Sequence, residues 1–289
     1  MDTRHRARRA TAFDVAQLAG VTQPTVSRAL RGSPNVSNET RARVIAAAQE
    51  LNYVPDANAA SLRGGETNTL ALVIICRPGE APTHVNPFYF SLMGSVAASA
   101  ALAGYKVLVS VQDSQGNFSG GYDDARQADG MIVIGTTQNM AAWEYFRSID
   151  YDGKAWACWG SPFDELGWVR SDNAEGGRIA TDHLVAGGRR KIVFIGSRTS
   201  LQRQFDERYQ GYEAAMIAHG LSPVLVEVDE AMNREEQGAV AVRRMVASGM
   251  AFDGIFAACD LMALGALRSL EDAGISVPKQ VGVVGFDGI

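Results

Sequence analysis

The sequence predicts a small all-α head followed by a larger α/β body with two lobes. Between residues 13 and 51, apolar residues recur at helical spacing on either side of a glycine, which is the pattern of a helix-turn-helix. From Thr69 onward, continuous apolar strands alternate with amphipathic helices. This alternation is typical of parallel sheets with helices on both faces. About eight such units are more than one sheet usually holds, so we expect two doubly wound parallel sheets.

The head should contain three helices, at about residues 13–20, 22–30 and 37–51. Gly20 permits the sharp turn between the first two helices, Thr22 can cap the second and Ser37 the third. Pro24 falls in the first turn of the second helix, where its missing N–H costs little. We expect three buried apolar faces: Val15, Leu18 and Ala19; Val26, Ala29 and Leu30; and Val44, Ile45, Ala48 and Leu51.

Positive charge is concentrated in the first part of the chain. Residues 1–63 carry nine arginines against five acidic residues, a net charge of +4, whereas the whole chain has −5 and the remainder therefore −9. Part of this charge lies in the run from Arg4 to Arg9. A basic head on an acidic body suits a polyanionic partner for the head alone. Together with the helix-turn-helix, it predicts binding to double-stranded DNA.

The body should begin after a short hinge. We expect a DNA-binding head at 1–51, a hinge at 52–66 and a body at 67–289, divided into lobes at about 67–170 and 171–289. The expected strands are 70–75, 106–111, 130–134, 155–159, 191–195, 224–228, 254–258 and 280–284. Helical patterns between them include 90–103, 176–186, 208–219, 235–248 and 260–272. The chain stops just after an apolar strand, so we expect either a truncated C-terminus or a second chain that covers this strand.

Several functional classes lack their sequence signatures. The three cysteines and four histidines are widely spaced, so we expect neither disulfides nor a metal site, and no cofactor. The chain has no signal peptide and no run of 18 apolar residues, which predicts a cytoplasmic protein that does not enter a membrane. An enzyme fused to a DNA-binding head is an alternative, but G-x-G-x-x-G, P-loop and G-x-S-x-G motifs are all missing. A transport binding protein is a third alternative, which the missing signal peptide and the helix-turn-helix both oppose. A transcriptional activator is the alternative nearest to a repressor, and a reporter assay distinguishes the two.

Six ordered motifs resemble the lactose-repressor/galactose-repressor (LacI/GalR) family of bacterial regulators. They start at Asp14, Leu51, Asp172, Arg208, Asp260 and Val277: DVAxxAGVTxxTVSR, LNYVP, DN, RYQGY, DLMALG and VP followed by VGFD. The resemblance implies a body like that of periplasmic sugar-binding proteins, whose lobes close on a small ligand. It also implies a homodimer that represses transcription and responds to an effector, a sugar. The segment between Val111 and Gly130 is short for this family, so we expect an abbreviated helix there.

The second helix of a helix-turn-helix presents its first residues to base edges in the major groove. Gln23, Pro24 and Thr25 hold these positions, with Arg28 one turn further on. Gln suits an adenine edge and Arg suits guanine, and the family resemblance makes Gln23 and Pro24 the main specificity pair. Short hydroxyls suited to phosphate contacts complete the set: Thr22, Thr25 and Ser27.

The hinge adds two further candidates. In the family, a leucine at the position of Leu62 enters the minor groove from each of two subunits and kinks the duplex. The alternative is that Leu62 packs on the partner's hinge, or that the hinge is a plain linker. Asn58, one helical turn before Leu62, could contact the groove or the backbone. Two heads on a two-fold axis would read a pseudo-palindromic operator.

The resemblance places the effector between the lobes. Arg208 and Asp287 match family positions that bind ligand hydroxyls or carboxylates, and Asp260 lies at a strand-to-helix junction. Phe88 and Phe256 could stack on an apolar ligand face, and Asn173 could reach the cleft. Asp260 could instead serve as a helix cap, and Phe88 could be a core residue.

Overall fold

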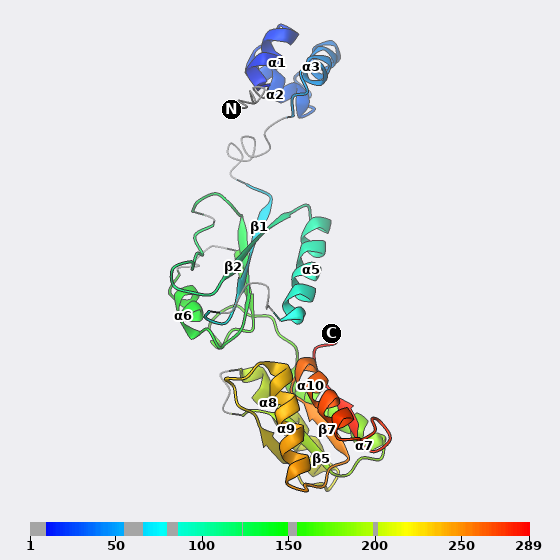
Figure 1. Cartoon of the computed structure of the whole chain (residues 1–289). Helices are drawn as coiled ribbons and strands as arrows, with labels where there is room; N and C mark the ends of the chain where they lie inside the picture. The colour runs from blue at the N-terminus through cyan, green and yellow to red at the C-terminus, as the bar shows by residue number, and fades with distance from the viewer. Residues whose placement is uncertain (1–9, 55–65, 80–85, 123, 150–154, 199–201) are drawn as a thin grey trace, which may run out of the picture. The chain divides into compact units, whose positions relative to one another are not determined.

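The computed structural model describes residues 10–54, 66–79, 86–122, 124–149, 155–198 and 202–289. The chain forms two compact units, Met1–Thr67 and Asn68–Ile289. The described part of the first unit is helical, and the second unit contains parallel sheets with flanking helices (Figure 1). No helix within these described ranges is long and apolar enough to cross a membrane.

Over residues 10–54, the first unit forms a head of three helices: α1 (Ala12–Ala19), α2 (Gln23–Leu30) and α3 (Asn38–Glu50). Gly20 ends α1 in the left-handed conformation, with φ of 65°, which a residue with a side chain rarely adopts. The Ser37 side chain accepts a hydrogen bond from the backbone N–H of Thr40 and so caps α3, as predicted. The core is built from one face of each helix: Val15, Ala16, Ala19, Val26, Ala29, Val44, Ala47 and Ala48, with Val36 from the loop.

Two details of the head differ from the prediction. Leu18 and Ile45 were expected in the core, but 48% and 40% of their surfaces are exposed, because Ala16 and Ala47 hold the inward positions instead. Thr22 occupies the N-cap position of α2 but makes no side-chain cap hydrogen bond. Its hydroxyl lies 3.0 Å from that of Thr25. Alanines and valines therefore fill the inward positions, and Leu18 and Ile45 lie at the rim.

The first lobe of the body is a parallel sheet with strand order β2-β1-β3-β4. Its elements in chain order are β1 (Thr69–Ile75), α5 (Pro87–Leu102), β2 (Lys106–Gln112), β3 (Gly130–Gly135), α6 (Met140–Ser148) and β4 (Ala155–Trp159). Successive β1 residues face opposite sides: Val73 and Ile75 pack in the cluster that contains Trp143 of α6, whereas Ile74 packs near Tyr89 of α5. The two helices accordingly lie on opposite faces of the sheet (Figure 1).

Between β2 and β3 the chain forms turns. Residues 113–122 and 124–129 contain no helix, and Gln112 is buried beneath them. The Gln112 amide donates to the Ser119 carbonyl (2.9 Å) and the Tyr122 hydroxyl (3.2 Å). The sequence predicted an abbreviated helix in this connection, and within these ranges the structure has none. The hydrogen bonds of the buried Gln112 amide hold the turns in place.

The second lobe repeats the parallel design, with strand order β6-β5-β7-β8. Its elements are α7 (Asn173–Ala186), β5 (Ile192–Gly196), α8 (Arg203–Ala218), β6 (Val224–Glu227), α9 (Arg234–Ala247), β7 (Gly254–Ala257), α10 (Asp260–Asp272) and β8 (Gly282–Val284). A Cβ added at Gly211 of α8 would lie 1.9 Å from the Ala174 carbonyl oxygen, so α7 and α8 touch through their backbones. This close approach brings the start of α7 beside the side chains of α8.

Candidate functional site

A cavity of about 620 Å³ lies in the body where both lobes contribute residues. In parallel α/β folds, ligands bind at the carboxyl ends of strands, and the lining follows that rule. The first lobe supplies residues after β1 and β3, the last residue of β4, and residues from the start of α5. The second lobe supplies residues from the starts of α8, α9 and α10 and from the segment after β8.

Arg208 and Asp287 form a buried ion pair that faces this cavity. The Arg208 Nη2 atom lies 3.3 Å from Asp287 Oδ1, and the two side chains are 4% and 10% exposed. Arg208 also donates to the Ala258 carbonyl (2.6 Å) and to Asn173 Oδ1 (3.0 Å). Its guanidinium carbon lies 3.6 Å from the ring centre of Phe286. All three nitrogen atoms of the guanidinium group thus have partners, which fixes its orientation.

Burial dominates the electrostatics of this pair. It raises the pKa of Asp287 to about 6, although the neighbouring Arg208 acts in the opposite direction. It also lowers the pKa of Arg208, against the attraction of Asp287. A ligand hydroxyl that donates to Asp287 and accepts from Arg208 would therefore meet charges poorly screened by water.

Asn173 and Asp260 support the Arg208–Asp287 pair but are not among the residues that line the cavity. Asn173, at the start of α7, accepts from Arg208 and donates to Glu207 Oε2 (2.8 Å). Asp260 is the first residue of α10, where Cys259 holds the cap position. Its carboxylate accepts from the backbone N–H groups of Gly288 (2.7 Å) and Ile289 (2.8 Å). These two side chains hold Arg208 and the segment that carries Asp287.

The aromatic candidates separate into one cavity residue and one core residue. Phe88 lines the cavity with Trp159, and their ring centres are 4.9 Å apart. Phe256 in β7 is fully buried and packs edge-on against Phe194, with ring centres 5.1 Å apart. The prediction that Phe256 stacks on a ligand is therefore wrong, because its side chain points from the strand into the core of the lobe. Strand residues alternate sides, and this one faces a helix layer.

In the head, the start of α2 is a solvent-exposed polar edge. Gln23, Pro24 and Arg28 are exposed, and Thr25 and Ser27 are partly so, while Val26 and Ala29 are buried. Thr22 is exposed at the cap position. The candidates for base and phosphate contacts thus lie together on the face opposite the core. The hinge candidates Asn58 and Leu62 lie outside the described residues.

Comparison with known proteins identifies this combination of head and body. A model of the bacterial regulatory proteins of the lacI family matches residues 11–56, and a periplasmic binding protein-like domain matches residues 181–289. The chain is 33% identical over 288 residues to the HTH-type transcriptional regulator CelR of Thermobifida fusca. This match covers 98% of the chain and 83% of the relative. The chain belongs to the LacI family.

Other LacI-family comparisons agree. The ribose operon repressor of Escherichia coli K12 is 31% identical, over 97% of this chain and 83% of the relative. A solved transcriptional regulator CelR–cellobiose complex has a TM-score of 0.62 at 31% identity and covers 97% of this chain and 83% of that one. The Lac repressor dimer bound to operator and the anti-inducer ONPF shares the fold, with a TM-score of 0.74 at 24% identity over 98% and 83%. The predicted fold and family are confirmed, and the chain is a DNA-binding transcriptional regulator.

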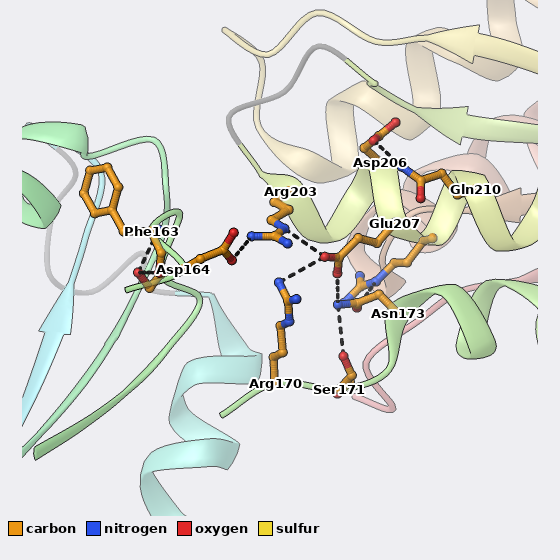
Figure 2. A network of polar contacts seen from close by, with 11 residues as sticks. Phe163, Asp164, Arg170, Ser171, Asn173, Arg203, Asp206, Glu207 and Gln210 are labelled. Carbon is orange, nitrogen blue, oxygen red and sulfur yellow. Dashed lines mark hydrogen bonds and ion pairs between the residues drawn. The ribbon is translucent and has the colours of Figure 1, made fainter. Parts of the chain in front are cut away.

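A polar network in this LacI-family body links the two lobes to Arg208. Figure 2 shows Glu207 of α8 between Arg170 and Arg203, each with a nitrogen atom 3.0 Å from Glu207 Oε1. Arg203 also pairs with Asp164 of the first lobe. The same Glu207 carboxylate accepts from Asn173, which holds Arg208. The Glu207 carboxylate therefore connects the Arg203–Asp164 ion pair, which joins the two lobes, to Arg208 in the wall of the cavity.

Sequence reasoning missed most of the cavity lining, including Trp159 and Arg234. Trp159 is the last residue of β4, and Arg234 is the first residue of α9. Both positions follow from the rule that ligands bind at the carboxyl ends of parallel strands. Applying that rule to every strand–helix junction, rather than to family motifs alone, would have found them.

Proposed function

We propose that this LacI-family regulator is a homodimeric repressor in the cytoplasm that binds a pseudo-palindromic operator. A small polyhydroxylated ligand, a sugar, binds in the cavity of the body and changes the operator affinity. The observation that carries the ligand part is the buried Arg208–Asp287 pair, which faces a cavity also lined by Phe88 and Trp159.

The chemistry of the lining favours a sugar. A carboxylate and a guanidinium together can bind adjacent hydroxyl groups, with each hydrogen bond strengthened by the charge. Aromatic rings such as Phe88 and Trp159 suit the apolar face of a pyranose. The CelR relative was solved in complex with cellobiose, which supports the same class here. In this proposal Asn173 and Asp260 orient the binding groups rather than touch the ligand.

On the DNA side, Gln23 and Pro24 read base edges, and Arg28 contacts guanine one turn further on. Thr22, Thr25 and Ser27 bind phosphates, as their exposure at the start of α2 allows. Asn58 and Leu62 of the hinge contact the minor groove, a role that rests on the family resemblance. Two heads are needed because each one reads only half of the operator.

Ligand and DNA are coupled through the lobes. A ligand that binds one lobe arrangement more tightly shifts the population toward it and changes operator affinity by about 5–150-fold. The ligand leaves the cavity chemically unchanged, since the proposed role is binding and not turnover.

The test is a titration of the full chain with the DNA upstream of its own gene, at fixed salt, with and without a panel of sugars. We expect specific binding that at least one compound changes by fivefold or more. The compound should be recovered intact. Specific DNA binding that no compound alters would contradict the effector part, and binding without sequence preference would contradict the operator part.

The recognition helix has its own test. Gln23→Ala should reduce discrimination between operator variants by about 1–3 kcal/mol at one position of each half-site, since a bidentate contact to a base edge is lost. Arg31→Ala is the matched control just past the other end of α2, because that residue is exposed but lies beyond the base-reading edge. Specificity profiles that are the same for Gln23→Ala and the parent chain would remove Gln23 from the reading set.

A further inference from the structure

A second arginine lines the cavity, and its hydrogen bonding is incomplete. Arg234 Nη1 donates to Gln237 Oε1 (2.9 Å), whereas Nη2 is buried and has no hydrogen-bond partner among the described residues. Gln237 is itself held in place, because its amide donates to the carbonyls of Asp229 (2.8 Å) and Met232 (3.2 Å). A buried charged donor without an acceptor is costly, so this position calls for a partner that the protein does not supply.

Arg234 and Arg208 share one aromatic neighbour, which places them in the same part of the cavity wall. Their guanidinium carbons lie 4.7 Å and 5.6 Å from the ring centre of Phe205. The two groups differ in their partners, however. Arg208 is neutralised by Asp287 and has acceptors at all three nitrogen atoms. Arg234 is the one of the two whose guanidinium has a buried nitrogen atom without any acceptor.

Two further charged side chains act on Arg234. Arg77 also lines the cavity, donates to the Glu230 carbonyl (2.8 Å), and is close enough to lower the pKa of Arg234, in the same direction as burial. The Glu230 carboxylate acts in the opposite direction, and its Oε1 atom is buried without a hydrogen-bond partner among the described residues. The two acids in the lining already have basic partners, since Glu235 pairs with Arg268 and Asp287 pairs with Arg208. Neither of these two acids accepts a hydrogen bond from Arg234 Nη2.

We infer that the effector is a polyhydroxylated anion, a sugar acid or a sugar phosphate, whose charged group binds Arg234 while its hydroxyls meet Arg208 and Asp287. A carboxylate or phosphate oxygen supplies the missing acceptor for Arg234 Nη2. This inference rests on the proposed function, since it takes the cavity as the effector site. It distinguishes this chain from the CelR relative, whose solved complex contains the neutral sugar cellobiose.

The test is isothermal titration of the full chain with matched pairs that share a carbon skeleton and differ in charge. The probes are glucose, gluconate, glucuronate and glucose 6-phosphate, together with cellobiose and cellobionate. We expect at least one anionic member to bind tenfold or more tightly than its neutral counterpart. A preference for glucose 6-phosphate points to a phosphate source, and a preference for the acids points to a carboxylate.

Three variants locate the effect. Arg234→Gln should reduce the preference for the anion to less than twofold, and Arg234→Lys should retain part of it because the charge remains. Arg244→Gln is the control, since Arg244 is an exposed arginine on the same helix that does not line the cavity. Thermal unfolding without ligand checks the fold: Arg234→Gln should unfold at an equal or higher temperature, because it removes a buried donor that lacks an acceptor.

The possible results distinguish failure of the anion inference from failure of the proposed effector role. Neutral sugars that bind as tightly as the anions, or no binding by any anionic member, would overturn the inference. An anion preference that survives in Arg234→Gln would also overturn it. An anion that binds through Arg234 but leaves operator affinity unchanged would support the inference while contradicting the proposed effector role.

Discussion

The two lobes contribute different chemistry to the same cavity. The first lobe contributes an aromatic wall, with Phe88 and Trp159 in contact and Tyr89 at 5.9 Å from Trp159 between ring centres. The second lobe contributes a charged wall built around Arg208 and Asp287. A ligand held by one wall alone would lose either its hydrogen bonds or its apolar contacts. Full affinity therefore requires both lobes at once, which couples binding to lobe position.

The charged wall should carry the larger share of the binding free energy. Arg208→Ala removes charge-assisted hydrogen bonds worth about 2–3 kcal/mol, so effector affinity should fall roughly 100-fold. It also leaves Asp287 buried without its partner, at a cost of about 3–5 kcal/mol in unfolding free energy. Calorimetric titration and urea denaturation measure the two effects.

An exposed arginine provides the comparison for Arg208→Ala. Arg178 on α7 pairs with Glu175 and Asp182, but its side chain is 49% exposed. Arg178→Ala should therefore cost less than about 1 kcal/mol in stability and leave the effector affinity unchanged. Equal losses in the two variants would mean that burial does not set the strength of the charged wall.

Glu207 supports the charged wall from behind. Glu207→Gln removes the negative charge that Arg170, Arg203 and Asn173 share, so the unfolding free energy should fall by about 2 kcal/mol. Urea denaturation measures this loss. Asp206→Asn, at the neighbouring position of α8, weakens a partly exposed pair with Arg198 and a hydrogen bond from Gln210, and should cost less than about 1 kcal/mol. If Glu207→Gln lowers the unfolding free energy no more than Asp206→Asn does, water screens the ion pairs of Glu207 and the network adds little stability.

The aromatic wall can be tested within a single helix. Phe88→Ala should weaken effector binding about tenfold, or roughly 1.4 kcal/mol, because one apolar contact face is lost. Phe90 lies two residues further along α5, is exposed, and does not line the cavity. Calorimetry should find Phe90→Ala within twofold of the parent chain. A loss of 100-fold or more in Phe88→Ala would reverse the ranking of the two walls.

The pH dependence of binding should come from the charged wall. The pKa of Asp287 is raised to about 6, with Arg208, Arg234 and Asp260 as its charged neighbours. A ligand hydroxyl that donates to the ionised carboxylate stabilises that form, so affinity should be constant above pH 6 and fall by up to about tenfold per pH unit below it. Asp287→Asn should flatten the profile between about pH 5 and 7. Affinity that rises on acidification would indicate that the ligand prefers the protonated group.

The sequence predicted the fold better than it predicted the cavity. Strand and helix periodicity located both sheets, because burial on both faces leaves long apolar runs such as Leu70–Ile75. Arg208 and Asp287 were found through family motifs, and the structure brings them into contact. Phe256 was misplaced because the pattern of a strand does not reveal which of its two faces is turned toward a cavity and which toward the core.

Arg234 illustrates what a sequence cannot reveal by itself. An arginine at the start of a helix resembles any solvated charge, and only the packing of Phe205 and Gln237 around it makes its unfilled hydrogen-bonding capacity visible. The hydrogen bonds of Asn173 to both Glu207 and Arg208 are likewise a property of the α7–α8 contact at Gly211. Local sequence predicts elements, whereas the partner of each side chain depends on contacts between elements.

The position of Trp159 gives the molecule an intrinsic optical signal. Its indole lies at the end of β4 in the lining of the cavity, whereas Trp143 is fully buried and donates to the Thr136 carbonyl (3.0 Å). A ligand that enters the cavity changes the polarity around Trp159 and leaves that of Trp143 constant. Of the four tryptophans that emit together in the unlabelled chain, Trp159 is the one that lines the cavity, so a change in the emission spectrum can report occupancy of the cavity.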